Sequence, residues 1–198
     1  MAFTVTALEI PGLTLIDSDV FVDHRGVFVE SYREKVFSED FTVPAFVQGN
    51  VSVSNDLVAR GLHYQVEKPQ GKLMRTVAGR TINVVLDMRA GSKTFGHYTW
   101  VSLGYPARAL WVPPGFANGF IAMTNNTAVA YECSSYHHVG SDRAVNMQDV
   151  LRRIAASAPD ELALEGLPSI DGLTLSAKDI AAPVFEHGEP VPESEWRS

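Results

Sequence analysis

Residues 72–89 read K-L-M-R-T-V-A-G-R-T-I-N-V-V-L-D-M-R, and this stretch decides the fold. Apolar and polar residues nearly alternate along it, and a period of two is typical of β-strands rather than of helices. Ala78 and Gly79 interrupt the pattern near its middle, as glycine does at turns. The stretch therefore predicts two successive strands joined by a short turn.

Short runs of the same kind recur through the first two thirds of the chain. They are rich in Val, Ile, Thr and aromatic residues, and Gly, Pro, Asn and Asp separate them. The runs lie at 5–16, 25–31, 46–54, 97–103, 108–114, 119–125 and 127–136. Eight or more strands at this spacing predict an all-β fold, such as a sandwich, a jelly roll or a barrel.

The pattern changes near residue 146. Residues 146–166 carry apolar side chains at a helical spacing that Ala158 and Pro159 close. A second short helix is expected from Ser176, and residues 32–41 form the one early segment with helical character. We expect a single domain over 1–198, with a β core at about 5–145 and a helical and loop appendage at about 146–198.

Composition narrows the classes of function. The chain has 198 residues and a net charge of −7, without a run of Lys and Arg, which argues against binding to nucleic acid. No apolar stretch is long enough to span a membrane, and no signal peptide is evident. Cys133 is the single cysteine, which fits a reducing compartment. We therefore expect a cytoplasmic protein without a membrane partner.

The segment R-G-L-H-Y-Q at 60–65 contains the most informative histidine. Three interpretations of an imidazole there are possible: a metal ligand, a general base, or a hydrogen-bonded residue of the core. The metal hypothesis can be tested against the sequence, because two segments resemble the paired motifs of cupins, small β-barrels that usually bind a metal. In those motifs Gln65 and Asn118 stand where a cupin has histidines. Because amides are poor ligands beside imidazole and carboxylate, we expect no metal site.

The reading of His63 as a general base requires a carboxylate partner and a proton worth removing. Arg60 and Lys72 supply a reason to expect such a proton, since two cations near a base suit an enolate oxygen or a phosphate. In a regular strand Arg60 and His63 would face opposite sides, unless a bulge or Gly61 reorients them. Solvated surface charge is the alternative for both cations.

Six motifs, in this order, resemble those of the dTDP-4-dehydrorhamnose 3,5-epimerase family. They are D-x-R-G-x-F-x-E at 23–30, Q-x-N-x-S-x-S at 48–54, R-G-L-H-Y-Q at 60–65, K-L at 72–73, D-M-R-A-G-S-x-T-F-G at 87–96 and L-S-x-K-D at 175–179. The resemblance covers residues 20–136 and returns at 175–179. It implies a cupin-like jelly-roll barrel, usually a homodimer, that epimerises a nucleotide 4-keto-6-deoxyhexose without a metal or organic cofactor.

The resemblance also assigns roles to residues of this chain. His63 matches the base, Asp179 its carboxylate partner and Tyr131 the acid, while Arg60 and Lys72 match the groups that hold the enolate oxygen and the nearby sugar. The residues that match substrate contacts, or lie near the base, are Arg25, Phe28, Glu30, Gln48, Asn50, Asn118, His137 and Lys178.

The chain departs from the family pattern at three places. Asn118 replaces a histidine that usually contacts the substrate. His137 stands where the family usually has an aromatic ring that stacks on the nucleotide base, with Tyr136 one position earlier. The segment 146–166 replaces a short aspartate-proline stretch, which leaves Asp142 as the candidate for an acidic contact. These departures concern substrate binding and leave the proton-transfer residues intact.

Several functions therefore stay open beside 3,5-epimerisation. A mono-epimerase would invert only C3 or C5, and a 3,4-ketoisomerase would return the proton to oxygen instead of carbon. A binding protein would hold the nucleotide sugar without catalysis. The presence of His63, Lys72, Tyr131 and Asp179 together favours catalysis, because a binding protein has no need of the full set.

Overall fold

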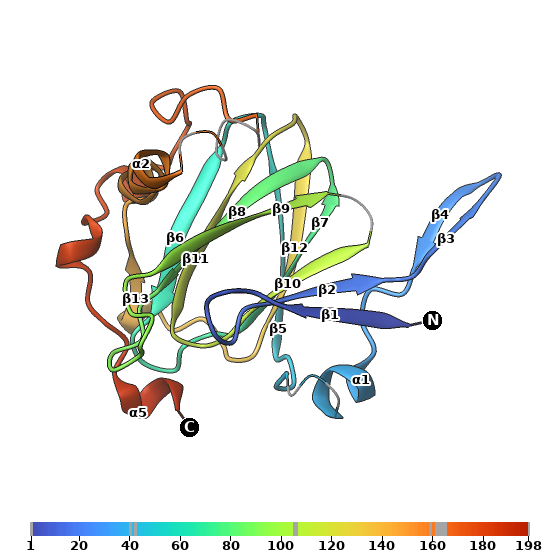
Figure 1. Cartoon of the computed structure of the whole chain (residues 1–198), viewed down its shortest axis with the longest axis horizontal. Helices are drawn as coiled ribbons and strands as arrows, with labels where there is room; N and C mark the ends of the chain where they lie inside the picture. Colours follow the sequence, from blue (N-terminus) through green and yellow to red (C-terminus); the bar gives the residue numbers. More distant parts are fainter. Residues whose placement is uncertain are drawn as a thin grey trace.

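The computed structural model describes residues 2–39, 41, 43–104, 107–158, 160 and 166–197. Two antiparallel sheets form most of it and face each other in a jelly-roll barrel (Figure 1). The first sheet has the order β1 (Phe3–Ala7), β2 (Thr14–Ser18), β10 (Arg108–Val112), β7 (Lys72–Ala78), β12 (Thr127–Cys133), β5 (Gln48–Ser54). The second has the order β13 (Asp142–Ala144), β6 (Ala59–Gln65), β11 (Phe116–Ala122), β8 (Arg80–Asp87), β9 (Tyr98–Gly104). The predicted all-β fold is confirmed.

The stretch 72–89 forms β7 and β8 as predicted, but the two strands belong to different sheets. Both faces of β8 pack against apolar side chains, whereas an alternating pattern usually has one apolar and one solvent-exposed face. Ile82, Val84 and Leu86 point outward beneath a helix, whereas Val85 packs in the interior with residues of both sheets. This strand therefore lies at the centre of the fold, and all but its first residue are buried.

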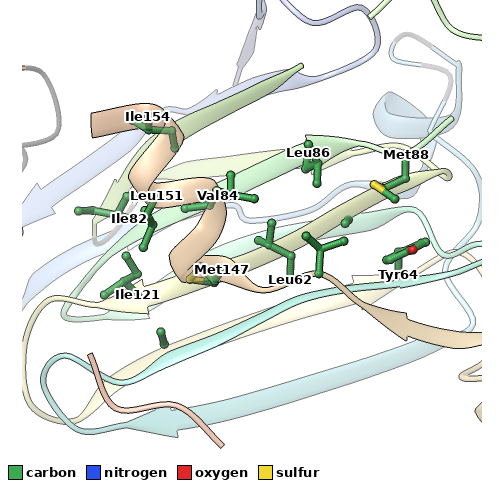
Figure 2. Packing of buried hydrophobic residues seen from close by; sticks show 14 of the residues in the cluster. Leu62, Tyr64, Ile82, Val84, Leu86, Met88, Ile121, Met147, Leu151 and Ile154 are labelled. Carbon is green, nitrogen blue, oxygen red and sulfur yellow. The ribbon is translucent and has the colours of Figure 1, made fainter. Parts of the chain in front are cut away.

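The covering helix is α2 (Met147–Ser157), which lies across the outer face of the second sheet (Figure 2). Its N-cap is Asn146, whose side chain accepts a hydrogen bond from the Asp149 amide and satisfies a free N–H of the first turn. Met147, Leu151 and Ile154 point down onto the sheet. The helix expected to close at Ala158 and Pro159 is thus confirmed, because α2 ends at Ser157 with Ala158 as its C-cap. Pro159 and residues 161–165 fall outside the described residues.

Shorter elements complete the chain. Helix α1 (Glu34–Glu39) packs Phe37 against the outer face of the first sheet, within the range 32–41 expected to be helical. The C-terminal segment contains α4 (Ala177–Ile180), the 3-10 turn η2 (Phe185–His187) and α5 (Glu193–Trp196), and a further 3-10 turn, η1 (Val139–Ser141), precedes β13. No helix in the described ranges is long and apolar enough to cross a membrane.

Strands β3 (Val20–Asp23) and β4 (Gly26–Val29) form a separate two-stranded hairpin that projects from the barrel (Figure 1). Its apolar side chains are exposed to an unusual degree: Val22 is 73% exposed and Phe28 is 60% exposed. Exposed apolar surface of this kind is typical of contact sites.

Candidate active site

The centre of the site is a pair formed by His63 on β6 and Asp179 on α4. His63 Nε2 lies 2.6 Å from Asp179 Oδ1, and the carboxylate side chain is only 4% exposed. A carboxylate accepts, so Nε2 carries the proton of the neutral imidazole and Nδ1 keeps its lone pair. This arrangement leaves Nδ1 as the nitrogen that can take a proton from a bound molecule.

The short helix α4 positions Asp179. Ser176 is the predicted N-cap, and its hydroxyl accepts a hydrogen bond from the Asp179 amide at 3.1 Å. The same hydroxyl donates to Asp179 Oδ2 at 2.8 Å. Each carboxylate oxygen therefore has one partner, which fixes the carboxylate plane and directs Oδ1 to His63. The expected helix start at Ser176 is confirmed.

A bulge in β6 brings Arg60 and His63 to one side of the strand. Asn118 pairs with His63 and Phe120 pairs with Arg60, so three steps along β6 oppose two along β11. The extra residue reverses the normal alternation of side chains. Gly61 makes this possible: its φ is +104°, and a Cβ would lie 2.8 Å from the Asn118 carbonyl oxygen. Both Arg60 and His63 consequently line the same cavity.

Arg60 is held by β5, which belongs to the other sheet. Its Nε donates to Ser54 Oγ at 3.0 Å. Ser52, two residues earlier, faces the same interior, and its hydroxyl is buried without a hydrogen-bond partner among the described residues. A buried hydroxyl without a partner is costly, so Ser52 is available to a bound polar molecule.

Lys72 on β7 reaches across the barrel to β11. Its ammonium donates to Asn118 Oδ1 at 3.0 Å, and Asn118 Nδ2 donates to Met74 Sδ at 2.6 Å. Burial lowers the pKa of Lys72, because removal from water disfavours the charged form. The ammonium nevertheless lines the cavity beside His63.

Tyr131 on β12 completes the set of titratable groups in the cavity. Its neighbours across the strands are Asn50 and Met74. Burial raises the pKa of the phenol, and Arg60 opposes this rise in part. The phenol is therefore protonated near neutral pH and can act as an acid.

The cavity that these residues line has a volume of about 500 Å³. A second hollow of about 370 Å³ shares His63, Lys72 and Tyr131 with it. The first is more apolar, with Phe120 and Leu175 in its wall, whereas the second is lined mainly by polar and charged side chains. Together they provide a recess with the proton-transfer groups at the point where its two parts meet.

The protonation state of His63 depends on opposing effects. Burial lowers its pKa most strongly, the hydrogen bond to Asp179 raises it, and the charge of Lys72 lowers it further. The net pKa lies below the ordinary value of 6.5, so the imidazole is neutral at pH 7. A neutral imidazole beside a carboxylate is the form that a general base needs.

The structure brings together most of the side chains expected at a site. The main cavity contains His63, Tyr131, Asp179, Lys72, Arg60 and Asn118, and the second hollow adds Gln48, Asn50, His137 and Lys178. His137, not Tyr136, faces the second hollow, and Tyr136 is 70% exposed. Asp142 also lies there and pairs with the Lys178 ammonium.

Arg25, Phe28 and Glu30 are not gathered at this cavity. Arg25 and Phe28 lie on the β3–β4 hairpin, where they border a different hollow. Arg25 is paired with Asp23, and Glu30, just after β4, is paired with Arg33. Within one chain these residues therefore line neither of the two hollows that contain His63 and Tyr131.

Ser52, Ser54 and Ser176 are site residues that the sequence reasoning did not assign. Ser52 and Ser54 belong to the motif Q-x-N-x-S-x-S, and the period of two places them on the same face as Gln48 and Asn50. The spacing therefore indicates which way their side chains point. That Ser54 pairs with Arg60 on β6 is visible only in the tertiary structure.

The amides in the cupin-like positions have structural partners. Gln65 Nε2 donates to the Lys68 carbonyl at 2.8 Å, and its Oε1 accepts from the His138 amide at 2.9 Å. Asn118 bridges Lys72 and Met74. Among the residues that the structure describes, no group of three or more His, Cys, Asp or Glu side chains is arranged to hold a metal ion.

A jelly-roll barrel with a carboxylate-bound imidazole, an ammonium and a phenol around one cavity has the groups that a proton-transferring enzyme requires. The chain belongs to the dTDP-4-dehydrorhamnose 3,5-epimerase family, whose sequence model matches residues 7–187. This is a family of carbohydrate epimerases, which are isomerases.

Individual relatives agree with this assignment. The chain is 37% identical over 178 residues to the dTDP-4-dehydrorhamnose 3,5-epimerase of Methanothermobacter thermautotrophicus, covering 89% of this chain and 90% of the relative. A Legionella pneumophila epimerase solved with dTDP-4-keto-L-rhamnose is similar with a TM-score of 0.81, 34% identity and 94% coverage of both chains. A 3'-monoepimerase from Streptomyces bikiniensis solved with dTDP-quinovose is similar with a TM-score of 0.74, 31% identity and coverage of 90% and 86%.

Proposed function

We propose that this chain catalyses 3,5-epimerisation of a dTDP-4-keto-6-deoxyhexose, dTDP-4-dehydro-6-deoxy-D-glucose. The observation that carries the proposal is the His63–Asp179 pair at 2.6 Å, which faces a cavity shared with Lys72 and Tyr131. Membership of the epimerase family, and the sugar nucleotide bound by the Legionella relative, support the choice of substrate.

The first step of the proposed reaction is removal of a proton from carbon. The 4-keto group acidifies the hydrogens on C3 and C5, and His63 Nδ1 takes one of them. The electron pair of the broken C–H bond moves onto the keto oxygen and forms an enolate. Asp179 stabilises the imidazolium, and the Lys72 ammonium and Arg60 stabilise the oxyanion.

The second step returns a proton to the opposite face of the same carbon. Tyr131 gives its phenolic proton to the enolate carbon, and the keto group re-forms. The raised pKa of Tyr131 keeps the phenol protonated until the enolate is present. The phenolate then recovers a proton from solvent, while His63 releases its own. The same two steps at the second carbon complete the 3,5-epimerisation. Protons alone are exchanged, so the balance requires no redox cofactor.

The nucleotide diphosphate belongs in the polar part of the recess in this proposal. Gln48, Asn50, His137 and Lys178 line the second hollow and offer donors for phosphate and base oxygens. The sugar then lies toward Ser52 and Arg60 in the main cavity. A cytoplasmic location forms part of this proposal, and the free buried thiol of Cys133 is compatible with a reducing compartment.

A homodimer is also proposed, because the hairpin residues need a second chain to act on the substrate. Arg25 and Phe28 border a hollow of their own, outside the cavity that holds His63. The exposed valines and phenylalanines of β3 and β4 would be covered by a partner. A symmetric pair of chains would let each hairpin reach the recess of the other.

Proton NMR of dTDP-4-dehydro-6-deoxy-D-glucose with the enzyme in D2O tests the reaction directly. We expect deuterium at both C3 and C5, and an inverted product once a reductase traps it. The His63→Ala variant is the control, because it lacks the proposed base and reports any exchange that does not depend on it. The proposal of catalysis would be contradicted if dTDP-, CDP- and GDP-linked substrates bind but none of them exchanges a proton with solvent. That result would indicate a binding protein.

A mono-epimerase is the second candidate, and Asn118 is the observation that favours it. This residue departs from the family's usual histidine at a position inside the cavity, and a 3'-monoepimerase is among the similar solved structures. Deuterium at only one carbon would support this candidate and exclude 3,5-epimerisation. Transfer of the keto group from C4 to C3 would instead identify a ketoisomerase.

A further inference from the structure

Asn118 is a buried amide whose two ends have different partners. The residue is 4% exposed, and its Oδ1 accepts from the Lys72 ammonium while its Nδ2 donates to Met74 Sδ. Chemistry alone fixes this orientation. An ammonium has only donors, and a thioether sulfur is only an acceptor, so the reversed amide would face Lys72 with its own donors. Met74 therefore keeps Oδ1 directed at Lys72.

The Lys72–Asn118 contact joins the two sheets at the level of the base. Lys72 lies on β7 of the first sheet, and Asn118 lies on β11 of the second. Asn118 is also the direct strand partner of His63. The residue that holds the ammonium is thus anchored to the strand that carries the base, so the ammonium keeps a fixed position relative to His63.

A neutral acceptor suits the charges around Lys72. His63, Tyr131, Cys133 and Asp142 lie around the ammonium on β6, β12 and β13. The same two hollows are also lined by Arg60, His137, Lys178 and Asp179. Burial already disfavours the charged form of Lys72. The histidine of the family pattern would hold the ammonium only while neutral, and its protonation would place a second cation beside Lys72. The amide accepts at every pH.

We propose that Asn118 is a positioning residue that holds the Lys72 ammonium for the enolate oxygen, rather than a direct contact of the substrate. This inference rests on the proposed enolate mechanism. In this role Asn118 acts through Lys72, and Met74 orients the Asn118 amide. Asn118 thus places an amide, which does not titrate, where the family usually has a histidine, next to the oxyanion that forms during the reaction.

Two variants of nearly equal size test the proposal. Asn118→Leu removes both polar ends, whereas Asn118→Asp keeps an acceptor for Lys72. We expect Asn118→Leu to lower kcat at least about tenfold, because a misplaced ammonium loses stabilisation of the transition state. KM should stay within about twofold, because the substrate loses no contact. Asn118→Asp should retain most of kcat. A large rise in KM with unchanged kcat would overturn the proposal.

A titration of Lys72 provides a readout independent of activity. The protein is labelled with 13C-lysine, and the Lys72 signal is assigned with Lys72→Arg. The Lys72 pKa should fall in Asn118→Leu, because the charged form loses its acceptor, and should rise in Asn118→Asp. An unchanged pKa in both variants would overturn the proposal.

Thermal melting checks folding, and Asn118→Ala replaces Asn118→Leu if that variant unfolds. Absence of exchange by the wild type would overturn the proposed function, whereas the Lys72 titration would still decide whether Asn118 holds the ammonium.

Asn118→His is the matched test of the missing titratable group. An imidazole at this position should add a second ionisation to the acid side of the pH profile of kcat. The wild type should show one. Identical profiles for the two proteins would contradict the role assigned to the neutral amide.

Discussion

His63 Nε2 and Asp179 Oδ1 lie 2.6 Å apart, and this contact joins a strand of the barrel to a short helix that is 116 residues away in sequence. The two residues are unequal in exposure: the His63 side chain is 35% exposed to the cavity, and the Asp179 side chain is 4% exposed. The imidazole is therefore the accessible member, and the carboxylate supports it from behind.

The variant Asp179→Asn should move the acid limb of kcat/KM to lower pH. Burial lowers the pKa of His63 and Asp179 raises it, so removing the carboxylate charge leaves the lowering effects unopposed. The plateau rate should also fall by about a hundredfold, because the imidazolium loses its stabilising partner. The measurement is kcat/KM for solvent exchange, determined as a function of pH from 5 to 9.

Asp171→Asn is the matched control for that profile. Asp171 pairs with Arg152 at the surface and is 83% exposed, so the same chemical change there should leave the profile unaltered. An acid limb that moves to higher pH in Asp179→Asn would show that the carboxylate does not raise the pKa of His63.

Tyr131→Phe should separate proton removal from inversion. His63 still forms the enolate, so deuterium wash-in continues, but no acid stands on the opposite face and net inversion falls by about 10²-fold or more. His63→Ala should abolish wash-in while leaving nucleotide binding largely intact. NMR in D2O and calorimetry with dTDP measure the two effects. Full epimerisation by Tyr131→Phe would assign the acid to another group.

Gly61→Ala should destabilise the fold and reduce activity together. A Cβ at Gly61 would lie 2.8 Å from the Asn118 carbonyl oxygen and from Gly119 Cα, and the φ of +104° is unfavourable for alanine. We expect a loss of about 1–3 kcal/mol in the free energy of unfolding. Urea denaturation measures this loss, with Gly49→Ala as the control because nothing lies within 4 Å of a Cβ there. Equal stability of the two variants would argue against a tight β6–β11 approach.

Mixing two inactive variants tests the role of the hairpin in a dimer. If Arg25 acts on the partner's recess, a mixed dimer of Arg25→Ala and His63→Ala chains contains one site with both native residues. Co-refolding equal amounts should then restore about a quarter of the wild-type activity, from random pairing in a symmetric dimer. If Arg25 acts within its own chain, every site has a defect and the mixture stays inactive. Ultracentrifugation of the wild type reports the oligomeric state.

The segment R-G-L-H-Y-Q contains both the chemistry that is visible in the sequence and a geometry that is not. The chemistry of its histidine followed from the residue type and from the resemblance to a family, and the structure places Asp179, Lys72 and Tyr131 around it. The sequence does not decide which face of the strand carries Arg60. That face is decided by the bulge at Gly61, which depends on how β11 pairs with β6. Register irregularities of this kind depend on the partner strand and are not visible in the strand's own alternation.

The local elements and the residue types of the reaction follow from the sequence. A period of two specified strands over 72–89, and a helical spacing specified α2, because these patterns reflect the backbone geometry of each element. The tertiary structure alone decided the long-range partners: Ser54 for Arg60, Asn118 for Lys72, and a position outside the cavity for Arg25. The physical reason is that a side chain's direction is a local property, whereas its partner depends on the packing of strands distant in sequence.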